Sequence, residues 1–137
     1  MGLVTAAKMN PHECRFTAPD GTSGEGKLLL MAVGNGHQCG GGYQVAPNAL
    51  LNDGLLDVFV VHDAEVQQLG LVLNEFLDPV AETNEFVTYR QLPAFSLEAS
   101  RPMQLNLDGE PFHDTSFQFK VRPKALRFIL GPEAPLA

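Results

Sequence analysis

The sequence predicts a mainly β domain, a β-sandwich with one clear α-helix, and three observations predict it. Short apolar runs recur along the chain, and several alternate apolar with polar residues, as strands half-buried in a sheet do. Gly and Pro number 13 and 10 among 137 residues, a content typical of folded, turn-rich chains. Only one segment repeats apolar residues at helical spacing. With 45% hydrophobic residues, residues 1–137 have enough apolar side chains for a single core and too little length for two ordinary domains.

A β-hairpin is the first predicted element. Residues 13–19 and 27–33 are apolar-rich, and residues 20–26 between them are dense in Gly, Asp and Ser, which favour turns. The apolar run 28–33 is continuous, which is typical of a strand buried on both faces. We therefore predict that this second strand is central in its sheet.

A glycine-rich loop is predicted for residues 34–54. The loop contains neither a phosphate-binding P-loop nor a dinucleotide motif, because Tyr43 and Gln44 follow Gly42 where Lys and Ser or Thr would be needed, and Pro47 interrupts any helix. Taken alone, its glycines could simply permit tight turns. A strand at residues 55–61 is predicted to end the loop. Long loops often carry function, so the loop is a candidate for the functional site.

The predicted helix covers residues 64–77, with Asp63 as its N-cap. Apolar side chains recur there at three- and four-residue steps, at Val66, Leu69, Leu73, Phe76 and Leu77. Five strand-like runs follow, at residues 86–90, 94–99, 103–107, 116–121 and 125–130.

Charge and composition exclude several classes of function. The net charge of −7 and the absence of a Lys or Arg cluster argue against binding to nucleic acid or to anionic bilayers through charge. No apolar segment reaches the ~20 residues of a membrane-spanning helix, and the first residues lack the order of a signal peptide, so a cytoplasmic protein is expected. We expect Cys14 and Cys39 to be reduced. The scattered histidines argue against a zinc site, and His37 and His62 are expected to be structural or solvated.

Two acidic motifs could carry chemistry. Asp53, in Asn-Asp-Gly before a buried strand, offers the hard oxygen ligands that Mg²⁺ prefers, although Asp-Gly can also be an ordinary turn. Asp108 and Glu110, in Asp-Gly-Glu-Pro after another strand, offer carboxylates that could accept a proton from a substrate hydroxyl. A solvated hairpin turn is the alternative for this second motif.

Five motifs in order resemble one known family. They are Val33-Gly34-Asn35-Gly36, Gly40-Gly41-Gly42, Ala46-Pro47-Asn48-Ala49, Asn52-Asp53-Gly54-Leu55-Leu56-Asp57 and Leu105-Asn106-Leu107-Asp108-Gly109-Glu110. Together they resemble the C-terminal domain of the diacylglycerol kinase, sphingosine kinase and bacterial lipid kinase superfamily, and within it the YegS-type branch. The resemblance covers about residues 13–136. In that family an N-terminal domain binds ATP through Gly-Gly-Asp-Gly-Thr, a motif absent from this sequence.

The resemblance implies roles for individual residues. Asp53 and the main-chain carbonyls of Leu50 and Leu55 would bind Mg²⁺, with Ca²⁺ as the alternative ion. Glu110 would be the general base and Asp108 the second choice for that role. Asp57 is interpreted as a structural neighbour. This interpretation requires Asp53 and Glu110 to meet at the rim of the folded domain.

The expected function is that of one half of an ATP- and Mg²⁺-dependent lipid kinase. The complete enzyme would phosphorylate a hydroxyl of a diacylglycerol- or phosphatidylglycerol-like lipid, contact the membrane peripherally through apolar side chains, and hold ATP mainly in its own N-terminal domain. This isolated domain would then be inactive. The alternatives are a non-catalytic β-sandwich module that binds a divalent cation or a carbohydrate, and a purely structural interaction domain.

Overall fold

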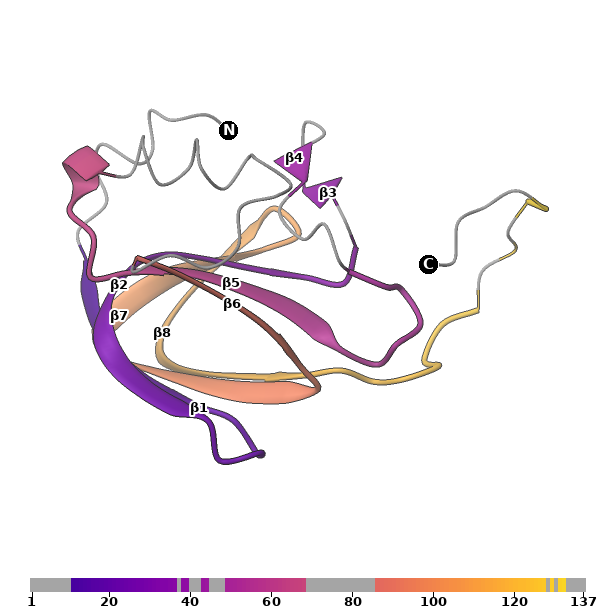
Figure 1. Ribbon diagram of the computed structural model, residues 1–137, viewed down its shortest axis with the longest axis horizontal. Coiled ribbons are helices and arrows are strands. Elements are labelled where there is room, and N and C mark those ends of the chain that lie inside the picture. The colour runs from indigo at the N-terminus through magenta and orange to yellow at the C-terminus, as the bar shows by residue number, and fades with distance from the viewer. Residues whose placement is uncertain are drawn as a thin grey trace.

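A computed structural model shows how the chain folds, and Figure 1 gives its arrangement. The structure describes residues 11–36, 38–39, 43–44, 49–68, 86–127, 129 and 131–132. Six strands form one antiparallel sheet in the order β6-β5-β2-β1-β7-β8, and β3 pairs with β4 in a separate two-stranded sheet. The strands are β1 (His12–Thr17), β2 (Ser23–Gly34), β3 (Gln38–Cys39), β4 (Tyr43–Gln44), β5 (Leu56–His62), β6 (Val87–Leu92), β7 (Ala94–Leu107) and β8 (Glu110–Lys120).

The predicted hairpin and central strand are confirmed. β1 pairs with β2 from His12 opposite Leu28 to Thr17 opposite Ser23, and the backbone N–H of Ala18 donates to the carbonyl of Thr22 across the turn (2.8 Å). β2 lies between β1 and β5, so it is paired on both edges. Its continuous apolar run therefore predicted its place in the sheet correctly.

The mainly β class is confirmed, but six of the eight described strands form one curled sheet rather than two flat layers packed as a sandwich (Figure 1). The long β7–β8 hairpin helps to explain the difference. Residues 94–99 and 103–107, predicted as two strands, belong to the single strand β7, whose pairing with β8 shifts between Glu98 and Met103. Such an irregularity bends a hairpin, so one pair of strands can follow the curl of the sheet.

Two other predictions about elements need correction. The predicted helix is not confirmed: its described residues hold only a 3₁₀ helix at Val66–Gln68, and residues 69–77 lie outside the described residues. Among the described residues, no helix has the length and apolarity needed to cross a bilayer. The strand predicted at 125–130 is wrong over residues 125–127, which follow Lys124 in a left-handed conformation (φ 58°) and leave Leu126 exposed.

Apolar side chains pack on both faces of the sheet. One cluster joins Phe59 and Val61 of β5 to Leu29, Ala64 and Val87. The second cluster lies on the other face, and its buried members are Val58, Leu92 and Phe95. Because neighbouring residues of a strand point to opposite faces, β5 is buried on both sides and forms a rigid support for the residues at its two ends.

Candidate functional site

The loop before β5 holds Asp53 in a tight turn. Its Oδ1 accepts a hydrogen bond from the backbone N–H of Leu55 (2.8 Å), and Gly54 has a φ of 74°, which L side chains rarely adopt. A side chain at Gly54 would meet Pro123 at 3.7 Å, so the turn lies against the segment that follows β8. The turn holds the half-buried Asp53 carboxylate in place. Leu50 and Leu55, whose main-chain carbonyls are the other predicted metal ligands, flank Asp53 in the sequence.

A second carboxylate, Asp57, lies four residues after Asp53, in strand β5. It is only 2% exposed. Its Oδ1 accepts hydrogen bonds from the hydroxyl of Tyr89 and from Nε2 of Gln91 (3.0 Å), while its buried Oδ2 has no hydrogen-bond partner among the described residues. Burial, the hydrogen bond to Asp57, and the charges of Asp57 and Asp53 together raise the pKa of Tyr89 well above its usual value. The charges of both carboxylates therefore act on the same side chain, that of Tyr89.

This arrangement fits a hard cation. Mg²⁺ binds through one or two carboxylates and completes its shell with carbonyls and water. Asp53 and the unpartnered oxygen of Asp57 supply such donors. Within the described part of the chain, no group of three or more His, Cys, Asp or Glu side chains forms a metal cluster. Within the described residues, an ion held here would thus depend on these two side chains and on backbone oxygens.

Asp108 and Glu110 lie at the turn between β7 and β8. Asp108 (φ 48°) and Gly109 (φ 94°) both have positive φ, as the two central residues of a type I′ hairpin turn do, and Leu107 pairs with Glu110 across it. Asp108 and Glu110 are both exposed. A carboxylate on such a rigid turn is accessible to a substrate that approaches from outside the domain.

The described contacts do not join Asp53 to this turn. In the part of the chain that the structure describes, no hydrogen bond or ion pair links Asp53 to Asp108 or Glu110, and β2 and β1 lie between β5 and β7 in the sheet. Figure 1 shows the β7–β8 hairpin bending so that its tip turns back toward β3 and β4. The convergence of Asp53 and Glu110 remains a prediction.

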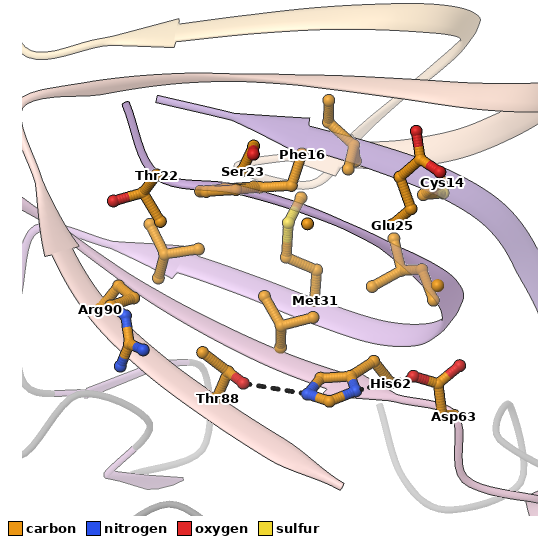
Figure 2. A pocket seen from close by; sticks show the side chains of 16 residues that line it. Cys14, Phe16, Thr22, Ser23, Glu25, Met31, His62, Asp63, Thr88 and Arg90 are labelled. Carbon is orange, nitrogen blue, oxygen red and sulfur yellow. Dashed lines mark hydrogen bonds and ion pairs between the residues drawn. The ribbon is translucent and has the colours of Figure 1, made fainter. Parts of the chain in front are cut away.

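A pocket of about 310 Å³ lies on the face of the sheet that carries Val58 and Val60 (Figure 2). Met31, Val58 and Val60 supply apolar surface, and Thr88 and Arg90 of β6 supply polar groups. Cys14, a free thiol, also lines the pocket, and burial raises its pKa. The side chain of Cys39 lies outside the described residues. The pocket therefore combines an apolar surface with a polar rim.

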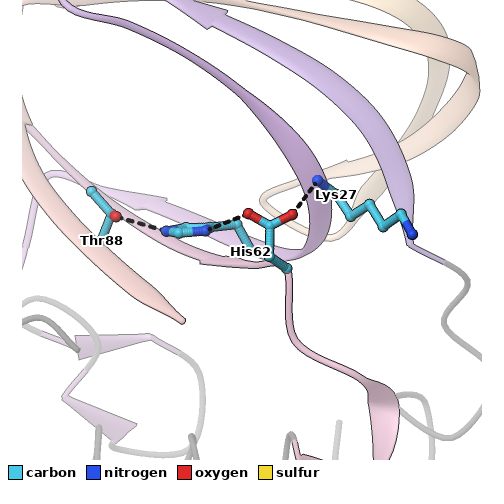
Figure 3. Close-up of polar contacts among 4 residues, drawn as sticks. Lys27, His62 and Thr88 are labelled. Atoms are coloured by element: carbon cyan, nitrogen blue, oxygen red, sulfur yellow. Dashed lines mark hydrogen bonds and ion pairs between the residues drawn. The ribbon is translucent and has the colours of Figure 1, made fainter. Parts of the chain in front are cut away.

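A chain of polar contacts borders the pocket (Figure 3). The ring of His62 contacts Thr88 Oγ1 through Nε2 (2.9 Å) and Asp63 Oδ2 through Nδ1 (3.1 Å), and the backbone N–H of Lys27 donates to Asp63 Oδ1 (3.0 Å). Since the Asp63 carboxylate only accepts, Nδ1 carries the proton and Nε2 of a neutral ring accepts from Thr88. A side chain at Gly26 would lie 2.9 Å from Asp63 Oδ2. Asp63 thus ties β5 to β2 and is not the predicted N-cap.

Asp63 should stabilise the fold at neutral pH and lose this effect in acid. The Lys27 N–H and then His62 lower the pKa of Asp63, so its contribution is complete above the ordinary aspartate value of about 3.9 and is lost as the pH falls through the lowered value. Asp63→Asn keeps a residue that tolerates φ 55°. We expect it to lower the free energy of unfolding at about pH 7 by about 1 kcal/mol, as for a solvent-screened hydrogen bond.

Urea unfolding at several pH values measures this difference. The difference between wild type and Asp63→Asn should shrink below about pH 4. Glu65→Gln, at an exposed position nearby, is the matched control and should change little. A difference between wild type and Asp63→Asn that stays constant into acid would contradict the assignment.

Sequence reasoning missed Asp57 and the pocket. The burial of Asp57 has a signal in the sequence, since it is the one charged residue in the apolar run 55–61, and the sequence interpretation places it as a structural neighbour of the metal site. The pocket is built from alternate residues of several strands, so its members are scattered along the sequence. Only the pairing of the strands brings them together.

Comparisons with known proteins match this chain over nearly its whole length. The model of the family described as "YegS C-terminal NAD kinase beta sandwich-like domain" matches residues 1–130. Two proteins named "Probable lipid kinase YegS-like" are similar to it. The one from Chromohalobacter salexigens is 38% identical over 97% of this chain and 42% of its own length, and the one from Pseudomonas fluorescens is 40% identical over 98% and 44%.

A solved structure shares the fold. A crystal structure of a diacylglycerol kinase from Bacillus anthracis superposes with a TM-score of 0.65 at 21% identity, over 88% of this chain and 43% of that one. The chain spans less than half the length of the curated relatives it matches. The family match and the identity to these relatives confirm the resemblance that the five motifs predicted: the chain belongs to the YegS C-terminal NAD kinase beta sandwich-like domain family.

Proposed function

We propose that this domain is the lipid-facing half of an ATP- and Mg²⁺-dependent kinase that phosphorylates a hydroxyl of a diacylglycerol- or phosphatidylglycerol-like lipid. The observation that carries the proposal is the half-buried Asp53 carboxylate, held in a tight turn before β5, in a domain whose relatives are named lipid kinases. ATP would be held by another domain, because this sequence lacks Gly-Gly-Asp-Gly-Thr. The domain alone should then have no kinase activity.

Each residue has a proposed role in the transfer. Glu110 accepts the proton of the lipid hydroxyl as that oxygen attacks the γ-phosphorus of ATP and ADP leaves, with Asp108 as the second candidate for this role. Asp53 and the carbonyls of Leu50 and Leu55 hold Mg²⁺, which when bound offsets phosphate charge. The type I′ turn supports the first role, because it holds the backbone at Glu110 in a defined turn and leaves the side chain exposed.

The pocket in Figure 2 is proposed as apolar contact surface for the lipid. Its Met31, Val58 and Val60 offer a surface on which hydrocarbon is favourable, and Thr88 and Arg90 offer hydrogen bonds to a polar head. A net charge of −7 gives little attraction to anionic bilayers. Apolar contact would therefore supply most of the affinity for a lipid, in peripheral contact with the membrane.

Met31→Gln tests this surface with a side chain of similar length. Its amide would have to be desolvated against hydrocarbon, so we expect the KM for the lipid to rise roughly 5- to 30-fold, equivalent to about 1–2 kcal/mol, with kcat little changed. The KM for ATP should not move. Met103→Gln, half-buried on β7 outside the pocket, is the matched control. Equal effects of the two substitutions on the lipid KM would argue against a lipid role for the pocket.

Phosphate transfer from ATP to a lipid is the direct assay of the proposed function. The protein that carries this domain with its ATP-binding domain is incubated with labelled ATP and vesicles of diacylglycerol or phosphatidylglycerol, with and without EDTA. Label in the lipid that disappears with EDTA supports the proposal. If the protein binds Mg²⁺ or Ca²⁺ in calorimetry but transfers no phosphate to either lipid, a non-catalytic cation-binding module is the better description.

A further inference from the structure

Asp57 is a buried carboxylate that is only half satisfied. It lies in β5 between two apolar residues, and only 2% of it is exposed. Tyr89 and Gln91, both on β6, donate to Oδ1, whereas Oδ2 has no hydrogen-bond partner among the described residues. Both donors are neutral groups. A buried carboxylate that keeps its charge needs a positive partner, and these contacts supply none.

The stretch of sequence around Asp57 contains no positive side chain. No Lys or Arg occurs between Leu28 and Tyr89, whereas eight of the 16 Asp and Glu residues do. Arg90 follows at once, but it pairs with Val58 and lines the pocket on the other face of the sheet, whereas Asp57 pairs with Gln91. A cation from solution would supply the charge that this stretch of sequence lacks.

A glycine and a further oxygen lie beside Asp57. Its partner on β2 is Gly34, and directly paired residues of antiparallel strands share a face, so this partner contributes no side chain next to Asp57. A methyl group added at Gly34 would lie 3.5 Å from the carbonyl oxygen of Gly36. Asp53 is close enough that its charge acts on Tyr89 together with that of Asp57. Asp53, the free oxygen of Asp57 and the carbonyl of Gly36 are thus the candidate oxygen donors on this side of β5.

We propose that the free oxygen of Asp57 is part of the cation site to which Asp53 belongs, and that Tyr89 and Gln91 hold the carboxylate in place through its other oxygen. This inference rests on the proposed function for the Mg²⁺ ion and for the metal role of Asp53. The site would connect the loop before β5 to the buried strand itself. Asp57 is then a metal-site residue and not a structural neighbour of one.

Asp57→Asn in this chain gives a result that a structural role would not give. The amide keeps an acceptor oxygen for Tyr89 and Gln91 but replaces the free oxygen by an NH2 group. In EDTA the variant should therefore unfold within a few degrees of wild type, because both hydrogen bonds are kept. Mg²⁺ should raise the Tm of wild type and leave that of the variant nearly unchanged. By calorimetry, Mg²⁺ affinity should fall about 10- to 100-fold.

Two further variants complete the design. Gly34→Ala places a methyl group beside Asp57 at ordinary contact distance from Gly36, so its Tm in EDTA should match wild type while Mg²⁺ affinity falls at least about tenfold. Asp114→Asn, exposed on β8, is the control and should bind Mg²⁺ as wild type does.

The outcomes separate this inference from the proposed function. If Asp53→Asn loses Mg²⁺ binding while Asp57→Asn and Gly34→Ala keep it, the inference is overturned and the metal role of Asp53 stands. If Asp57→Asn lowers the Tm equally in EDTA and in Mg²⁺, Asp57 is a structural hydrogen-bond acceptor. If wild type itself binds no Mg²⁺, the metal assignment of the proposed function fails, and this inference fails with it.

Discussion

Replacement of Glu110 by Gln is expected to lower kcat for lipid phosphorylation about 10²- to 10⁴-fold, because the amide cannot accept the proton of the attacking hydroxyl. Glu110 is exposed and pairs with Leu107 across the hairpin turn, so the substitution should leave the fold intact. The KM for the lipid should change little. Initial rates with the protein that carries both domains, measured at several lipid concentrations, separate the two constants.

Asp108→Asn is the matched control for Glu110→Gln. Asp108 has a φ of 48°, and Asn tolerates that conformation, so the turn keeps its shape while a carboxylate is removed. A small effect at Asp108 beside a large one at Glu110 assigns the base to Glu110. The reverse pattern assigns it to Asp108. A rate within a few-fold of wild type in both variants would remove general-base catalysis from this turn.

Strand positions could be predicted where the local pattern decides the structure. Asp20-Gly21 between two apolar runs predicted the β1–β2 turn, and the continuous run of β2 predicted its central place. The joining of residues 94–107 into β7 was not predictable from the pattern, because Pro102 interrupts the alternation. A shift of register between Glu98 and Met103 accommodates Pro102 within the strand. That shift arises in the pairing with β8, a strand that the local pattern of β7 does not reveal.

The candidate site was predicted in part for a similar reason. Asp53, Asp108 and Glu110 stand in short motifs with glycine neighbours, and the positive φ values of Gly54, Asp108 and Gly109 agree with those turns. The proposed metal role of Asp57 depends on its hydrogen bonds with Tyr89 and Gln91, more than thirty residues away, and on its pairing with Gly34. A carboxylate in an apolar run signals a buried charge, but only the strand pairing shows which partners it has and which it lacks.

Phe95→Ala is expected to destabilise the domain by about 3–5 kcal/mol. Phe95 is 2% exposed and lies between the rings of Phe16 (centroid distance 5.2 Å) and Phe119 (4.5 Å). It therefore joins β1, β7 and β8 on one face of the sheet, and its removal would leave a cavity among side chains of three strands. Since domains of this size are stable by only about 5–15 kcal/mol, the loss would approach the total.

Phe112→Ala provides a control with the same chemical change. Phe112 is 47% exposed on β8, so its removal should alter the free energy of unfolding by no more than about 0.5 kcal/mol. Urea unfolding of both variants measures the difference as a shift of the midpoint at constant slope. Similar shifts in the two variants would mean that the stacked rings do not hold the curled sheet together. A large shift for Phe95 alone would show that the sheet supporting the Glu110 turn depends on this aromatic stack.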